Sequence, residues 1–158
     1  MATKSIYEKQ LEELSTLIPL SAVKNSIVFG TYLSVLKIEF QIKNYLFKTG
    51  ITPKYTHDLR SLFETAKDTI TAADIEFQQI DHKLDDLRET LKNVFFQNKD
   101  ESGEKAPFRY YVNLRYINFC NFEANAEELN KISISAKSIS NSIELIFQNT
   151  PSLEHAAK

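Results

Sequence analysis

The residues best suited to bind a ligand lie between positions 108 and 116. This segment reads Phe-Arg-Tyr-Tyr-Val-Asn-Leu-Arg-Tyr, with two arginines among four aromatic side chains. Arginine binds phosphate and aromatic rings stack on unpaired bases, so the pattern is typical of contact with single-stranded RNA. In the alternative interpretation the tyrosines complete the core and the arginines pair with acids such as Glu123. The candidate binding residues are Arg109, Tyr110, Asn113, Arg115 and Tyr116.

A second candidate site is the dipeptide His57-Asp58, at the expected start of a helix. Backbone N–H groups and the local dipole at a helix N-terminus can hold an anion. The alternative interpretation is a capped helix start in which His57 is packed or solvated. Both residues are kept as candidate binding residues.

The sequence contains little of the chemistry on which metal or nucleotide enzymes depend. One cysteine, Cys120, and three scattered histidines do not make a zinc site. His82 lies beside three aspartates, a spacing that suits a metal ion but is also typical of a charged, solvent-facing stripe. Three glycines cannot supply a phosphate-binding loop. We therefore expect no metal, no cofactor and no catalytic residue from a known motif.

Length and composition favour one globular domain. The chain has 158 residues, of which 42% are hydrophobic and 25% charged. Its net charge of −2 means that binding to nucleic acid would need a local basic patch. The sequence has no signal peptide and no apolar stretch of about 20 residues, so we expect a cytoplasmic protein without a membrane segment.

Hydrophobic periodicity predicts an all-α, up-and-down bundle of four or five helices. Apolar residues recur at steps of three and four over residues 5–18, 21–49, 56–66, 71–94 and 125–149. Pro19 is expected to break or bend the chain, Gly50 to end the second helix in the left-handed conformation, and Thr56 to cap the third. The second helix is apolar on most sides, with Phe29 and Phe47 on its main face, which predicts a central position.

Other segments are expected to lie outside these helices. Residues 98–107 are polar and contain glycine and proline, which predicts a flexible internal loop. Residues 108–122 fit a strand, a short helix or an irregular segment. Residues 1–150 are expected to form the single domain, and 151–158 a frayed tail. A stripe of small residues around Gly30 allows close approach of another helix, from this chain or from a second subunit.

Three features, taken in chain order, resemble the HEPN domain family. A long helix ends in a turn that contains Lys-x-Gly and then proline. The run Thr56-His57-Asp58-Leu59 follows it, with Leu62 beyond. An Arg-Tyr dipeptide, Arg115-Tyr116 or else Arg109-Tyr110, then precedes a last helix that opens with acidic residues. The resemblance covers residues 21–147 and is sharpest in the first two features.

The resemblance implies a homodimer of helical bundles in a prokaryotic defence or toxin–antitoxin system. Its target would be RNA, a nucleotide, or a protein partner such as a nucleotidyltransferase. Ribonuclease members of the family carry a histidine four to six residues after an arginine, and no arginine here has one. We therefore expect a non-catalytic binding module. The alternatives are a diverged, metal-independent ribonuclease that uses His57 with Arg109 or Arg115, and a helical interaction domain unrelated to nucleic acid.

Overall fold

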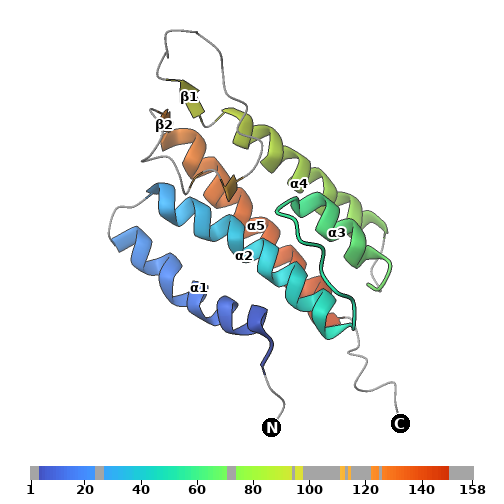
Figure 1. Cartoon of the computed structure of the whole chain (residues 1–158). Helices are drawn as coiled ribbons and strands as arrows, with labels where there is room; N and C mark the ends of the chain where they lie inside the picture. Colours follow the sequence, from blue (N-terminus) through green and yellow to red (C-terminus); the bar gives the residue numbers. More distant parts are fainter. Residues whose placement is uncertain are drawn as a thin grey trace, which may run out of the picture.

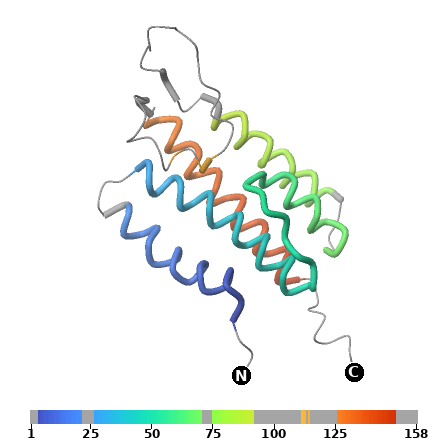
Figure 2. The backbone as a smooth tube through the Cα atoms, in the orientation of Figure 1, coloured from blue at the N-terminus to red at the C-terminus, as the bar shows by residue number. Residues whose placement is uncertain are grey.

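The computed structural model describes residues 4–23, 27–70, 74–93, 95–97, 111–112, 114, 122–124 and 126–149 (Figures 1 and 2). Within these ranges the helices are α1 (Ile6–Val23), α2 (Ile27–Lys48), α3 (Leu59–Lys67), α4 (Asp74–Asn93) and α5 (Ala126–Asn149). Two three-residue strands, β1 (Phe95–Gln97) and β2 (Phe122–Ala124), pair antiparallel at one end of the bundle. The predicted all-α fold is confirmed, with this short strand pair as an unpredicted addition.

Helix α2 is the central element, as its apolar sequence predicts. Helices α1, α3 and α5 all pack against it (Figure 1). Helix α5 runs in the same direction as α2, since Thr31 bonds to the carbonyl of Leu129 and Gln41 to that of Ser140, both at 3.3 Å. Helix α1 runs the opposite way, because Ser5 at its start bonds to Asn44 near the end of α2.

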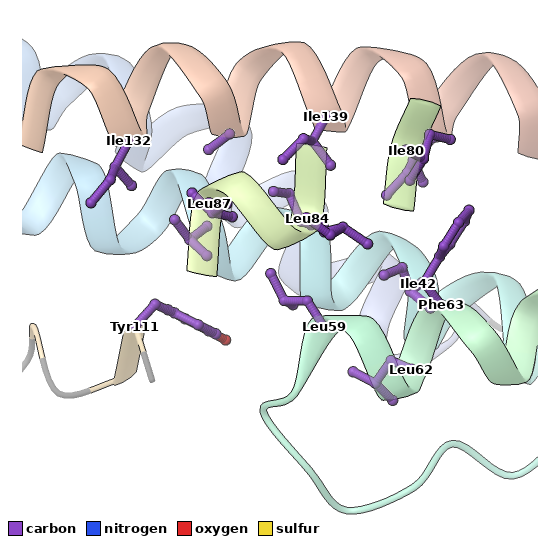
Figure 3. Close-up of a cluster of buried hydrophobic side chains, with 14 of the residues drawn as sticks. Ile42, Leu59, Leu62, Phe63, Ile80, Leu84, Leu87, Tyr111, Ile132 and Ile139 are labelled. Atoms are coloured by element: carbon purple, nitrogen blue, oxygen red, sulfur yellow. The ribbon is translucent and has the colours of Figure 1, made fainter. Parts of the chain in front are cut away.

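The core lies where α2, α3, α4 and α5 meet (Figure 3). The predicted apolar positions of α3, α4 and α5 are buried, apart from Phe77, which is half-buried, and Val94, which lies outside the described residues. The main face predicted for α2 is partly wrong, because Phe29 is 47% exposed and Phe47 is 55% exposed. The buried residues of α2 point in several directions, since the helix has neighbours on more than one side.

Of the two outcomes predicted at Pro19, a break or a bend, the break is wrong, because Pro19 lies inside α1. A proline in a helix interior costs about 3 kcal/mol through its missing N–H and its steric clash. The turn beyond it compensates by packing on α2: Ser21 is buried, and its hydroxyl donates to the carbonyl of Ile18 (2.6 Å). Residues 21–23, expected at the start of the second helix, therefore belong to α1.

Gly30 allows the close approach of α1 and α2. At this position of the small-residue stripe, the neighbouring helix therefore belongs to the same chain and not to a second subunit. A Cβ atom at residue 30 would lie 2.6 Å from the hydroxyl oxygen of Ser21. We expect Gly30→Ala to lower the free energy of unfolding by about 1 kcal/mol, because the clash outweighs the gain in helix propensity. In a Ser21→Ala background the same change should raise it by up to about 1 kcal/mol. Urea unfolding of the four variants of this cycle checks both signs, and equal effects in the two backgrounds would contradict the contact.

Gly50 is the left-handed residue of the turn that terminates α2, as predicted. The φ angle of Gly50 is 78°, and the N–H of Ile51 donates to the carbonyl of Leu46 (2.9 Å), which completes a Schellman motif. The chain then turns back along α2, so that residue 57 lies beside the middle of this helix before α3 begins (Figure 1). This return segment, residues 51–58, positions the site described below.

Several predicted features lie outside the described residues: the loop at 98–107, the tail at 151–158, and most of the segment 108–122. Within that last segment, Tyr111, Val112 and Leu114 have a 3₁₀-helical backbone rather than a strand. In the part of the chain that the structure covers, no helix is both long enough and apolar enough to cross a membrane.

Candidate functional site around Glu39

The side chain of Glu39 lies in the interior of the bundle, where it is 1% exposed. It accepts three hydrogen bonds from three parts of the chain. Lys43, one turn further along α2, donates to Oε1 (2.6 Å), His57 Nδ1 contacts Oε2 (3.0 Å), and the Tyr111 hydroxyl donates to the same Oε2. A buried carboxylate is tolerated only when it is paired and hydrogen-bonded. These three donors satisfy that requirement.

His57 lies at the boundary between this buried cluster and solvent. Because a carboxylate oxygen can only accept, Nδ1 is the donor to Glu39 and carries the hydrogen. The His57 side chain is 43% exposed, and Nε2 has no hydrogen-bond partner among the described residues. The ring also meets Tyr111 edge-on, with 6.3 Å between centroids. The imidazole is therefore fixed on its inner side and open to a ligand on its outer side.

His57 and Tyr111 line a pocket between the return segment, α3 and α4. The floor consists of leucines from α4 and the rim carries two arginines; the lining includes Leu84, Leu87, Leu91, Arg60 and Arg88. Figure 3 shows Tyr111 extending toward Leu59 of α3, near Leu87. The pocket volume is about 40 Å³, which is room for a few water molecules or one small group. A larger ligand would lie across its mouth.

The two arginines of the rim differ in their surroundings. Arg60 forms ion pairs with Asp81, with Glu64 (3.2 Å) and with Asp85 (3.5 Å). Arg88 is exposed and has no acidic partner among the residues that the structure describes. Of the two arginines at the rim, Arg88 is therefore the one that no acid of the described residues engages.

The N-terminus of α3 is capped by Asp58, so the prediction of Thr56 as the N-cap is wrong. The Asp58 carboxylate accepts from the N–H groups of Arg60 (3.1 Å) and Ser61 (3.4 Å), while the Thr56 hydroxyl accepts from the N–H of Asp58 (3.1 Å). The Thr56 hydroxyl therefore bonds within the return segment, before the first residue of α3. Asp58 is consequently engaged with its own helix, as in the capped alternative.

Acid–base pairs between α3 and α4 hold the rim in place. Lys67 bonds to both Glu64 (2.9 Å) and Asp81. The hydrogen bond from Lys67 lowers the pKa of Glu64 below its ordinary value, with smaller lowering from the charges of Lys67 and Arg60. The resulting stabilisation is present above the unfolded-state pKa and is lost as the pH falls through the lowered folded-state pKa. It is small, because the Glu64 side chain is 51% exposed.

The structure describes two of the predicted site residues, His57 and Asp58, and brings only His57 to the buried cluster. Arg109, Tyr110, Asn113, Arg115 and Tyr116 lie outside the described residues. Tyr111 and Leu114, which stand between them in sequence, are 1% and 2% exposed. The interpretation in which tyrosines of this segment complete the core is therefore correct for Tyr111.

Sequence reasoning missed Glu39, Lys43 and Arg88. The available signal was an acid and a base four residues apart within a helix that is otherwise apolar on most sides. Such a pair indicates buried charges that need each other. As to metals, no three His, Cys, Asp or Glu side chains gather into a possible ligand set within the described ranges.

These features define a class of protein: a helical bundle whose central helix buries a carboxylate beneath a half-exposed histidine and a small pocket. The model of the HEPN domain matches residues 25–144, which is most of the chain. The protein therefore belongs to the HEPN domain family, and this membership suggests a function related to nucleotides or of the ribonuclease type in general terms. No curated protein and no solved structure matches the chain.

Proposed function

We propose that the domain is a non-catalytic binding module that holds RNA or a nucleotide across the mouth of the His57 pocket. The observation that carries this proposal is that His57 and Arg88 line the same pocket. His57 is oriented by Glu39, and Arg88 has no acidic partner among the described residues. Membership of the HEPN family supports a nucleotide-related ligand.

Each part of the pocket has a role in this proposal. The guanidinium of Arg88 donates to a phosphate, for which its planar fork is well suited. The free Nε2 of His57 accepts a hydrogen bond, for which the 2′-hydroxyl of ribose is a donor. The leucine floor of α4 packs against the apolar face of the sugar or base. The predicted residues Arg109, Tyr110, Asn113, Arg115 and Tyr116 remain part of the proposal as further phosphate and stacking contacts, because they flank Tyr111 in sequence.

The test is the affinity of the full chain for a fluorescein-labelled single-stranded RNA of 12 nucleotides, measured by fluorescence anisotropy. We expect Arg88→Gln to weaken binding about tenfold or more, since a hydrogen bond to a charged group contributes roughly 1.5–3 kcal/mol. The matched control is Lys9→Gln, which removes an exposed charge from α1, on the other side of α2 (Figure 1). Equal losses in both variants, or no loss in either, would contradict the assignment.

A second candidate function is RNA cleavage, which the Glu39–His57 hydrogen bond favours. A carboxylate that orients imidazole through Nδ1 leaves Nε2 placed to act as a general base. Purified protein would be incubated with labelled RNA in EDTA, which inhibits contaminating metal-dependent nucleases. Cleavage by the wild type that disappears in His57→Gln supports a ribonuclease, whereas intact RNA after prolonged incubation supports the binding module.

We also propose that the domain acts as a cytoplasmic homodimer in a prokaryotic defence or toxin–antitoxin system, beside a nucleotidyltransferase or another protein. The support for this setting is family membership. Sedimentation velocity of the full chain tests the dimer, because a single species at the chain mass of 18.2 kDa would contradict it.

A further inference from the structure

The imidazole of His57 can offer a ligand two different hydrogen-bonding groups at one position. Nδ1 is bonded to Glu39 Oε2 (3.0 Å) and is always the donor, because a carboxylate only accepts. Nε2, on the half-exposed side of the ring, is an acceptor in neutral imidazole and a charged donor in imidazolium. Imidazole is the side chain whose charge changes between pH 5 and 8. The outer contact of His57 can therefore change from acceptor to donor within this range.

The buried cluster holds the ring in the same place in both states. Lys43 donates to Glu39 Oε1 (2.6 Å) and the Tyr111 hydroxyl donates to Oε2, so the carboxylate is fixed from two further directions. The Tyr111 ring also meets the imidazole edge-on. The bond from Nδ1 to Glu39 is present whether or not Nε2 carries a hydrogen. A proton at Nε2 thus changes what the ring offers to a ligand, and not where the ring lies.

Lys43 acts on His57 through Glu39. The side chains of Lys43 and Glu39 are 10% and 2% exposed, and their opposite charges balance within the interior. With a neutral imidazole, the cluster of Glu39, Lys43, Tyr111 and His57 therefore has no net charge. Without the ammonium of Lys43, the carboxylate would be left unbalanced beside the ring, and an adjacent opposite charge favours imidazolium. Lys43 is therefore a positioning residue that favours the neutral state of His57.

The other charged groups that line the pocket come from the return segment, α3 and α4: Asp58, Arg60 and Arg88. The carboxylate of Asp58 caps α3, and Arg60 is paired with acids of α3 and α4. Arg88 has no acidic partner among the described residues, and its charge is opposite to that of Asp58. Glu39 is thus the charged group that bonds directly to His57.

The next step rests on the proposed function, in which RNA or a nucleotide lies across the mouth of the pocket. We propose that His57 binds the 2′-hydroxyl of ribose when its imidazole is neutral and a phosphate oxygen when it is protonated. The neutral state selects RNA, because DNA lacks the 2′-hydroxyl. The charged state favours phosphate, because charge-assisted hydrogen bonds are about twice as strong as neutral ones. Phosphate is common to RNA and DNA, so the pH sets whether the site distinguishes them.

The test compares a single-stranded RNA with a single-stranded DNA of the same length and base sequence, with deoxyuridine in place of uridine. Both are labelled with tetramethylrhodamine, and their affinities for the full chain are measured by fluorescence anisotropy. At about pH 8 we expect RNA to bind about three- to tenfold more tightly than DNA, the effect of one neutral hydrogen bond. At about pH 5.5 both should bind more tightly, and the ratio should fall to less than about twofold.

The variant His57→Asn removes the outer contact and keeps the inner one. An asparagine amide can still donate to Glu39, but it has no atom at the position of Nε2. The RNA-to-DNA ratio should therefore be close to one at both pH values. The matched control is His82→Asn, the same substitution at an exposed histidine of α4 that does not line the pocket. This control should keep the wild-type ratio and its dependence on pH.

The variant Lys43→Met tests the positioning residue. The unbalanced carboxylate should favour imidazolium, so RNA selectivity should be lost at a higher pH than in the wild type, while circular dichroism confirms the fold. A purely structural role of Lys43 would weaken both ligands and leave the pH of this change where it was. That result would overturn the role assigned to Lys43.

The remaining outcomes separate this inference from the proposed function. RNA binding with the same RNA-to-DNA ratio at both pH values, or a ratio that still falls in His57→Asn, overturns the inference and leaves the binding module in place. Loss of the pH dependence in His82→Asn also overturns it. Absence of saturable RNA binding at either pH contradicts the proposed function itself, and the inference with it.

Discussion

Replacing Glu39 by alanine is expected to lower the free energy of unfolding by about 3–5 kcal/mol, the usual effect of removing one partner of a buried ion pair. The variant leaves Lys43, a buried residue, without the carboxylate that pairs with its ammonium. It also removes Glu39 Oε2 as an acceptor for the buried Tyr111 hydroxyl. Because small domains are stable by about 5–15 kcal/mol, much of the total would be lost. Urea unfolding followed by circular dichroism measures the change.

The double variant Glu39→Leu/Lys43→Met distinguishes charge from packing. Apolar replacement of both members of a buried pair leaves no uncompensated charge, so this variant should recover at least about 1–2 kcal/mol relative to Glu39→Ala. The hydrogen bond from Tyr111 to Glu39 is lost in both variants, which keeps that contribution constant. A double variant as unstable as Glu39→Ala would show that the ion pair is not what the single substitution disrupts.

The helices and most of the core followed from the sequence because their determinants are local. In α5 the apolar residues at steps of three and four, from Leu129 to Ile146, are all buried, and α4 follows the same rule from Ile80 to Leu91. The left-handed Gly50 was likewise predictable, since glycine adopts this conformation without steric cost. The errors lie where a tertiary contact overrides a local preference, as where the packing of Ser21 near Gly30 carries α1 past Pro19.

The site was beyond prediction because its members come from distant parts of the chain. Glu39 meets His57 only because residues 51–58 run back along α2, and it meets Tyr111 only because that residue packs against the same helix. No spacing rule connects these positions. The sequence did single out His57, but for its place at a helix start rather than for its bond to a buried carboxylate. In the sequence, nothing distinguishes Arg88 from any other exposed arginine. Its place beside His57 and Tyr111 on the pocket is visible only in the structure.

Replacing Phe63 by alanine is expected to lower the free energy of unfolding by about 3–5 kcal/mol, as for other buried phenylalanines. Phe63 is fully buried in α3, packs against Phe77 with ring centroids 6.3 Å apart, and lies beneath the ammonium of Lys67. Helix α3 has nine residues, and so short a helix depends on packing rather than on its own propensity. The local stability of α3 should therefore fall more than that of the other helices.

Hydrogen exchange locates this effect and connects it to the site. In Phe63→Ala the amides of residues 59–67 should exchange faster than those of α5, because α3 opens before the bundle unfolds. Opening of α3 releases the return segment that holds His57 against Glu39, so RNA binding should weaken at temperatures where the bundle is still folded. The control is Tyr55→Ala, which removes a fully exposed ring of the same segment and should change stability by less than about 0.5 kcal/mol. Uniform hydrogen exchange across the Phe63→Ala variant would contradict this prediction. It would show that α3 unfolds together with α2, α4 and α5 as a single cooperative unit. The His57 pocket would then be as stable as the bundle itself.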